Sequence, residues 1–286
     1  MITTTRFAPS PSGALHLGHA YAAIFAHDLA VRAGGRFLVR IEDIDRGRCR
    51  REHEEAIFAD LEWLGLSWEK PVRRQSEHFD GYRRACQSLA ELGVLYPCFC
   101  TRKDIAAEIA SSPSAPHGPD GPLYPGICRR LEPAERERLR ASGQPYALRL
   151  DVAAAGKRAG DELRFEELGG GPDSGVVVAR PEELGDVVIA RKDVGTSYHL
   201  AVTVDDALQQ VTDVSRGRDL FHATHIHRLL QALLELPTPR YHHHDLVRGE
   251  DGQRLATRDK ALALAALRSA GTSPAQIRAR LGLEAP

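Results

Sequence analysis

Two histidines and a glycine near the amino terminus have the types and spacing that a phosphate site needs. A strand-like run at residues 2–7 is followed by the sequence Ala-Pro-Ser-Pro-Ser-Gly at residues 8–13, and then by His16, Gly18 and His19. The start of a helix offers unpaired N–H groups and a partial positive charge, both of which favour an anion. Residues three apart share one face of the first turn, and a glycine lets a flat ring or a phosphate approach the backbone. The pattern therefore predicts a nucleotide site in which two imidazoles reach the α-phosphate.

A second chemical cluster consists of three cysteines. Cys98 and Cys100 flank a single residue, so they point to the same side of an extended segment, and Cys128 follows a loop rich in Pro, Ser and Gly that can fold back. A tetrahedral zinc ion needs a fourth ligand, for which His117 and Tyr124 are the candidates. Imidazole is far commoner than phenolate on zinc, so ligand chemistry alone favours His117. The alternative interpretation is three unrelated thiols with no metal.

Two other groups of residues are less suited to metal binding. Asp205 and Asp206 are adjacent, and neighbouring residues of a strand point to opposite faces. We therefore expect one of them to cap a helix at residues 207–210 and the other to line the site. A run of histidines near the carboxyl end also invites a metal interpretation, but no cysteine or carboxylate arrangement in the sequence supports it. The run comprises His222, His225, His227, His242, His243 and His244.

Composition excludes several classes of protein. The chain has 286 residues, which allow one large or two modest domains, and its formal net charge is −1, so it is not a general polyanion binder. A nucleic-acid contact would need a local patch such as Arg46, Arg48, Arg50 and Arg51, which equally fit a solvated helix start. The 5 cysteines are an odd number, which argues against a disulfide framework. Without a run of ~20 apolar residues or a signal-peptide pattern, we expect a soluble, cytoplasmic, monomeric enzyme with no membrane partner.

The elements that position these residues begin with a parallel sheet. Residues 2–7 and 36–41 are predicted strands, and residues 17–33 are the helix between them, which Gly34 and Gly35 end. This strand–helix–strand unit predicts an α/β fold with a Rossmann-like parallel sheet. Further helices are predicted at residues 52–65, 79–92 and 219–236, and further strands at residues 146–150, 186–191 and 202–204.

The order of these elements suggests four segments. The two halves of the catalytic domain are expected at residues 1–95 and 185–240. An insertion with the cysteine loop separates them at residues 96–184, and a loop with a short helical tail follows at residues 241–286.

Five ordered segments of the chain together carry a family resemblance. They lie at residues 6–19, 40–45, 198–206, 216–217 and 251–255. In this order they resemble the class I aminoacyl-tRNA synthetases of the glutamyl type. A lone His-x-Gly-His sequence is a weak signal, whereas five ordered segments are specific. The resemblance implies a Rossmann-like catalytic domain that uses ATP, with Mg²⁺, to activate L-glutamate.

The resemblance also assigns the substrate contacts. Glu42, at the carboxyl end of the second strand, would bind the α-amino group of glutamate, and the guanidinium groups would bind its carboxylates. A bidentate arginine prefers a carboxylate to an amide, which selects glutamate over glutamine. The glutamate site implied in this way comprises Arg6, Phe7, Ala8, Pro9, Ser10, Glu42, Tyr198 and Arg216. The ATP site comprises His16, Gly18, His19 and Thr257.

The second nucleotide motif departs from the family pattern. The pattern reads Lys-x-Ser-Lys-x, whereas residues 254–258 read Arg-Leu-Ala-Thr-Arg, so Thr257 stands where the catalytic lysine is expected. Losing one charged donor to a transition state costs roughly 3–4 kcal/mol. Arg258 is the candidate replacement, and the expected catalytic set is therefore His16, His19, Thr257 and Arg258.

Two features resemble one branch of the family, which glutamylates queuosine. Only a short tail follows Arg258, too short for the helical anticodon-binding region of full glutamyl-tRNA synthetases. The Cys-x-Cys…Tyr-x₃-Cys spacing is similar to the zinc site of this branch, which implies that Tyr124, not His117, completes a structural zinc site. The implied reaction activates glutamate without tRNA and transfers it to queuosine at the anticodon wobble position of tRNA(Asp). The alternatives are an impaired relative that binds glutamate or tRNA, a synthetase acting at the 3′ end, and an adenylyltransferase for a small acid.

Overall fold

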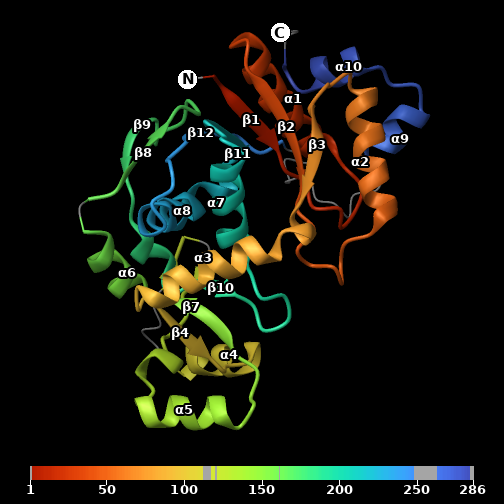
Figure 1. Ribbon diagram of the computed structural model, residues 1–286. Coiled ribbons are helices and arrows are strands. Elements are labelled where there is room, and N and C mark those ends of the chain that lie inside the picture. Colours follow the sequence, from red (N-terminus) through yellow and green to blue (C-terminus); the bar gives the residue numbers. More distant parts are fainter. Residues whose placement is uncertain (1, 112–116, 120, 161, 248–262, 284–286) are drawn as a thin grey trace.

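The first half of the sheet is the predicted βαβ unit with one further strand. The structure is a computed structural model that describes residues 2–111, 117–119, 121–160, 162–247 and 263–283. Strands β1 (Thr4–Phe7), β2 (Arg36–Ile41) and β3 (Glu69–Arg74) pair in parallel, joined by helices α1 (Leu17–Arg32) and α2 (Arg51–Trp63) (Figure 1). Helix α1 ends where predicted, because Gly34 adopts a φ of 58°, which side chains disfavour.

The second half of the sheet lies beside β1. Its strands follow the order β11 (Asp213–Gly217), β12 (Arg240–His244), β8 (Arg164–Glu167) and β9 (Gly175–Val178), of which only β9 is antiparallel. The backbone N–H of Thr212 donates to the carbonyl of Thr4 at 2.9 Å, which joins the start of β11 to β1. The strand order therefore reverses between β1 and β11, the arrangement of a doubly wound α/β fold. This confirms the predicted fold class.

Helices α3 (Phe79–Glu91), α6 (Val152–Ala159), α7 (Tyr198–Leu208) and α8 (Phe221–Leu233) share one hydrophobic core. Leu89, Leu200 and Ile226 are fully buried there. Helix α8 starts at Phe221 and not at Asp219, because residues 218–220 form a 3₁₀ turn. The 3₁₀ turns are η1 (Gln75–Glu77), η2 (Cys128–Arg130), η3 (Pro181–Leu184) and η4 (Arg218–Leu220).

The insertion and the residues that flank it form a small antiparallel sheet in the order β10 (Val188–Ala190), β7 (Ala147–Leu150) and β4 (Leu95–Cys98). Helices α4 (Arg102–Ser111) and α5 (Pro133–Ala141) lie at the end of the molecule farthest from β1 (Figure 1). A short hairpin of β5 (His117–Gly118) and β6 (Gly121–Pro122) belongs to the same region. The strand predicted at residues 146–150 is confirmed.

The carboxyl-terminal helices α9 (Leu264–Ser269) and α10 (Pro274–Arg280) pack against the first half of the sheet. Leu264 and Ile277 are fully buried in the core of α1 and α2. Arg278 forms an ion pair with Asp28 of α1 at 2.6 Å. In the ranges that the structure covers, no helix has both the length and the apolar character of a membrane span.

The strand predicted at residues 202–204 is wrong, because these residues lie inside helix α7. The side chain of Ser197 caps the helix by accepting a hydrogen bond from the N–H of Leu200. Val202 and Val204 are buried among neighbouring helices, and this burial overrides the strand preference of β-branched residues. The prediction that Asp205 and Asp206 point to opposite faces fails for the same reason, since successive helix residues do not face opposite ways.

Candidate active site

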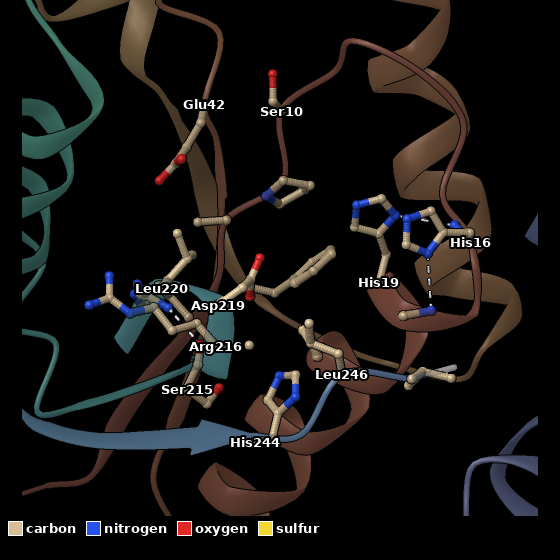
Figure 2. Close-up of a pocket in the computed structure, with 18 of the residues that line it drawn as sticks. Ser10, His16, His19, Glu42, Ser215, Arg216, Asp219, Leu220, His244 and Leu246 are labelled. Carbon is tan, nitrogen blue, oxygen red and sulfur yellow. Dashed lines mark hydrogen bonds between the residues drawn. The ribbon is translucent and has the colours of Figure 1, made fainter. Parts of the chain in front are cut away.

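A cavity of about 430 Å³ opens where β1, β2 and β11 end, at the point where the strand order reverses. The imidazoles of His16 and His19 lie on one side of this cavity and Arg216 on the other (Figure 2). Its walls contain all of the glutamate-site residues predicted from the sequence, together with the described residues of the ATP site. They are Arg6, Phe7, Ala8, Pro9, Ser10, His16, Gly18, His19, Ala22, Glu42, Tyr198, Ser215, Arg216, Gly217, Asp219, Leu220, His244, Leu246 and Val247.

His16 and His19 are held by a reciprocal cap at the start of α1. The Nδ1 of His16 accepts from the N–H of Gly18 at 3.1 Å, and the Nδ1 of His19 accepts from the N–H of His16 at 3.2 Å. The two ring centroids are 3.9 Å apart. Since Nδ1 accepts in both rings, each neutral imidazole carries its proton on Nε2, which suits donation to an anion. A Cβ at Gly18 would lie 3.0 Å from the His16 ring, so glycine preserves this geometry.

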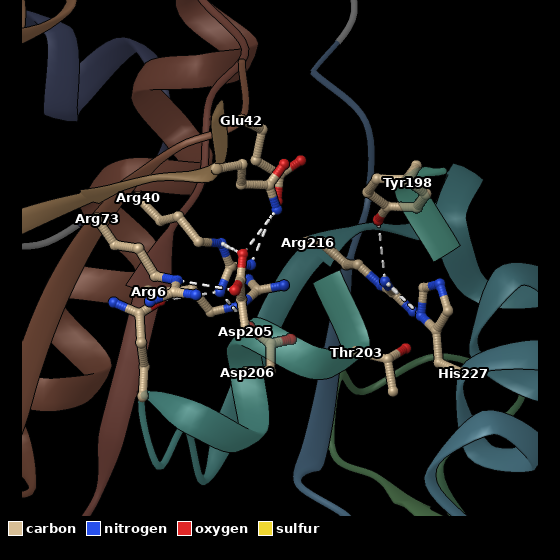
Figure 3. Close-up of polar contacts among 12 residues, drawn as sticks. Arg6, Arg40, Glu42, Arg73, Tyr198, Thr203, Asp205, Asp206, Arg216 and His227 are labelled. Atoms are coloured by element: carbon tan, nitrogen blue, oxygen red, sulfur yellow. Dashed lines mark hydrogen bonds and ion pairs between the residues drawn. The ribbon is translucent and has the colours of Figure 1, made fainter. Parts of the chain in front are cut away.

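The carboxylates of α7 join the two halves of the domain (Figure 3). Asp206 accepts from the Nε of Arg6 at 3.0 Å and from NH1 of Arg40 at 2.7 Å. Burial favours a higher pKa for Asp206, but both guanidinium groups outweigh it and hold the pKa below its usual value. Asp205 accepts from Arg73 at 2.7 Å and from the phenol of Tyr82 at 2.8 Å. The prediction that one aspartate caps a helix at residues 207–210 is therefore wrong.

Glu42 follows β2 directly and lines the cavity. It accepts from NH2 of Arg40 at 3.2 Å. Burial raises the pKa of Glu42, although the positive charges of Arg40 and Arg6 oppose this effect. Glu42 lies at the cavity, as the sequence predicted, whereas the expectation that Asp205 or Asp206 lines it is wrong. The pairing of Asp206 with Arg6 and Arg40 was not predicted, because these partners precede it by more than 160 positions.

Tyr198 and Arg216 meet at the far wall of the cavity. Tyr198 is the first residue of α7 and Arg216 lies on β11, and NH1 of Arg216 donates to the Tyr198 hydroxyl at 3.2 Å (Figure 3). Arg216 is only 6 % exposed. Burial raises the pKa of Tyr198, so its phenol keeps the proton at neutral pH. The structure thus brings together the pair that the sequence predicted.

Three cysteines and a tyrosine converge in the insertion. The sulfurs of Cys98, Cys100 and Cys128 lie within 4.8 Å of one another, so this cluster could hold a metal ion. The phenol oxygen of Tyr124 is 3.4 Å from the Cys98 sulfur and 3.6 Å from the Cys100 sulfur. A tetrahedral zinc with ~2.3 Å Zn–S bonds places its ligand atoms roughly 3.8 Å apart, which these separations approach. The side chain of His117, the other candidate ligand, lies outside the described residues.

A second convergence involves two of the histidines for which no metal was expected. Ligand atoms of Glu183, His222 and His225 lie within 4.8 Å of one another, so a carboxylate does approach them, contrary to the sequence analysis. However, the Nδ1 of His225 accepts from the N–H of Arg180 at 3.3 Å. A histidine that binds a metal through one ring nitrogen normally donates a hydrogen bond from the other. The Nδ1 of His225 accepts a hydrogen bond instead, so this ring does not have the arrangement of a metal ligand.

The second nucleotide motif, with Thr257 and Arg258, lies outside the described residues. The residues that flank this segment are both at the cavity, because Val247 lines it and Ala263 forms a β-bridge with His16. The wall also includes Asp219 and His244, which sequence reasoning did not select. Position alone could have suggested them, because they lie near the carboxyl ends of β11 and β12.

The fold and the site define the class of protein. The model of the family "tRNA synthetases class I (E and Q), catalytic domain" matches residues 2–284, and the chain belongs to this family. It is 52% identical to the glutamyl-Q tRNA(Asp) synthetase of Rhodobacter capsulatus, over 98% of this chain and 99% of that protein. It is 39% identical to the glutamate–tRNA ligase of Aquifex aeolicus, over 94% of this chain but 54% of the ligase.

Solved structures of glutamate–tRNA synthetases are also similar to this chain. The crystal structure of the glutamate–tRNA synthetase from Elizabethkingia anophelis aligns with a TM-score of 0.75 and 26% identity, over 91% of this chain and 53% of that one. The ligase of Elizabethkingia meningosepticum in complex with its amino acid aligns with a TM-score of 0.74 over 52% of its length. The chain thus spans about half of these solved synthetases.

Proposed function

We propose that the chain is an ATP-dependent ligase that activates L-glutamate without tRNA and transfers it to the queuosine base of tRNA(Asp). The observation that carries this proposal is the 52% identity to a glutamyl-Q tRNA(Asp) synthetase over 99% of that protein's length. The match to a glutamate–tRNA ligase is weaker, at 39% identity over 54% of the ligase. Action at the tRNA 3′ end is therefore the less favoured reaction.

Recognition of glutamate rests on opposite charges at two walls of the cavity. The Glu42 carboxylate lines the cavity just after β2 and would bind the α-ammonium group of glutamate. Arg216, on the other wall, would bind the side-chain carboxylate. Arg6 is already paired with Asp206, so its remaining donors serve a supporting role. Glutamine would leave a guanidinium facing a neutral amide, which disfavours it.

Activation requires one bond to form and one to break. An oxygen of the glutamate α-carboxylate attacks the α-phosphorus of ATP, and the bond to pyrophosphate breaks as pyrophosphate leaves. The start of α1, together with the Nε2–H groups of His16 and His19, would stabilise the negative charge that grows on the phosphate oxygens. We assign Arg258 the role of the missing lysine, next to Thr257. A hydroxyl of queuosine then attacks the activated carbonyl carbon, and AMP leaves.

Zinc fits the three cysteines better than the harder divalent ions do, because thiolates are soft ligands. We propose Tyr124 as the fourth ligand, since its oxygen lies beside the sulfurs of Cys98 and Cys100. A site with four protein ligands has no open position for water, so its role would be structural. It would hold the loop between β4 and η2 in place.

The first test is glutamate-dependent exchange of labelled pyrophosphate into ATP without any tRNA. The proposal predicts exchange with glutamate and none with glutamine or aspartate. Binding of glutamate without exchange would contradict the proposed activity and identify an impaired relative. Exchange that appears only when tRNA is added would contradict tRNA-independent activation.

A further inference from the structure

The guanidinium of Arg216 is surrounded by neutral hydrogen-bond acceptors. Its Nε donates to the Nε2 of His243 at 3.1 Å, and NH1 contacts the Nδ1 of His227 at 3.2 Å. NH1 also donates to the Tyr198 hydroxyl, and NH2 donates to the Thr224 hydroxyl at 2.6 Å. Among the residues that the structure describes, no carboxylate forms an ion pair with Arg216. A positive charge that is 94 % buried therefore lacks a direct anionic partner at the cavity wall.

The other buried arginines of the site differ in this respect. Arg6 and Arg40 both contact the carboxylate of Asp206, at 3.0 and 2.7 Å. A carboxylate at that distance neutralises a guanidinium and competes with any anionic ligand. The acceptors around Arg216 fix the orientation of the guanidinium without supplying a negative charge.

The proton positions on the His243 ring follow from its contacts with Arg216 and Glu167; the Thr224 hydroxyl also lies 3.2 Å from its Nε2. A guanidinium N–H can only donate, so the Nε2 of His243 must accept and its proton must sit on Nδ1. This Nδ1–H donates a hydrogen bond to the carboxylate of Glu167, which lies 2.5 Å from Nδ1. Glu167 also accepts from the backbone N–H groups of His243 and Gly169, which fixes its own position.

His227 has the opposite tautomer by the same reasoning. Its Nδ1 accepts from Arg216, so its proton sits on Nε2, which lies 3.2 Å from the Nδ1 of His199. His227 and His243 are 3 % and 0 % exposed. Each ring also contacts a further polar side chain, which is His199 for His227 and the buried Glu167 for His243.

We propose that His227 and His243, held by His199 and Glu167, are positioning residues that aim the uncompensated guanidinium of Arg216 at the side-chain carboxylate of the substrate. We call these four residues the histidine cradle. The inference rests on the proposed recognition of glutamate and adds the residues that determine it. Because the groups that contact Arg216 directly are neutral acceptors, the substrate carboxylate is the group that completes the ion pair, and a neutral amide cannot replace it.

The test compares three variants of helix α8. His227→Phe keeps a ring but removes the acceptor, His227→Gln restores an acceptor, and His222→Phe is a matched control that does not contact Arg216. In pyrophosphate exchange, we expect His227→Phe to raise KM for glutamate roughly 10- to 100-fold with kcat changed far less. His227→Gln should recover most of that loss. Equal KM values in His227→Phe and His222→Phe would overturn the proposal.

A measurement on the unmodified protein keeps the proposal testable if the variants do not fold. Long-range ¹H–¹⁵N spectra of the histidine rings at pH 7 should show His243 protonated on Nδ1 and His227 protonated on Nε2. A charged ring at either position, or the opposite tautomer, would overturn the cradle. This readout is independent of activity. If the protein shows these tautomers but no glutamate-dependent exchange, the proposed function is contradicted and the cradle is not.

Discussion

At the scale of single residues, the proposed selection of glutamate depends on the planar guanidinium of Arg216. Lysine keeps the charge but offers one compact ammonium that cannot contact His227, His243 and a carboxylate together. We expect Arg216→Lys to raise KM for glutamate roughly 100-fold, as lost charge-assisted hydrogen bonds of about 1.5–3 kcal/mol imply. Steady-state pyrophosphate exchange measures this. Arg218→Lys is the control, since Arg218 pairs with Asp245; an equal effect of both would refute the assignment.

The role of Arg258 gives a second prediction at the same scale. If Arg258 supplies the charge of the absent lysine, Arg258→Ala should slow pyrophosphate exchange about 100-fold. Adding Thr257→Lys to that variant should restore the rate, because it puts a cation at the position where the family pattern has one. Single-turnover rates with saturating ATP and glutamate measure the chemical step. A rate unchanged by Arg258→Ala would show that Arg258 does not take the place of the absent lysine.

The residues that line the cavity were easier to predict than those that support them. Short patterns placed His16, His19 and Glu42 at the cavity, because each lies at the end of a strand or the start of a helix. The contacts of Asp206 and His243 were not predicted. Their partners come from distant segments of the chain, and no local spacing encodes such contacts.

At the scale of elements, the proposed zinc site would hold the loop between β4 and η2 through its cysteines. We expect about one zinc ion per chain, and Cys128→Ser should lose it and unfold at a temperature several degrees lower. Metal analysis and thermal unfolding measure the two effects. Cys86→Ser is the control, because Cys86 lies in a different core. Full zinc content in the Cys128→Ser protein would contradict the site.

The wrong assignment of α7 also belongs to this scale. Two valines in residues 202–204 read as a strand, yet the segment is a helix buried against α3 and α8. Periodicity cannot separate a short buried strand from a buried helix. The cap at Ser197 was the local signal that favoured a helix.

At the scale of the whole molecule, the buried histidines make stability depend on pH. Burial lowers the pKa of His199 to about 4, with Arg216 acting in the same direction. Burial also lowers the pKa of His243 to about 4, where Arg216 and Arg218 add to the effect and Glu167 opposes it. Between pH 4 and the ordinary value of 6.5, the unfolded chain therefore binds protons that the folded chain does not. This contribution is complete above pH 6.5 and is lost as the pH falls.

Urea denaturation between pH 7.5 and 4.5 measures this dependence. Each such histidine contributes a slope of about 1.4 kcal/mol per pH unit to the free energy of unfolding. We expect His199→Phe to reduce the slope of the unfolding free energy against pH, below pH 6, by the amount that about one bound proton contributes. Other acidic groups titrate in both proteins, so the difference between the two curves is the readout. Identical slopes would show that His199 is not buried in its neutral form.

The most direct test of the whole account is transfer of labelled glutamate, with ATP, to tRNA(Asp) with and without queuosine. We expect label only on the modified tRNA, and we expect it to stay after the 3′ terminal nucleotide is removed. Label on unmodified tRNA that disappears with that nucleotide would contradict the account and identify a synthetase that acts at the 3′ end.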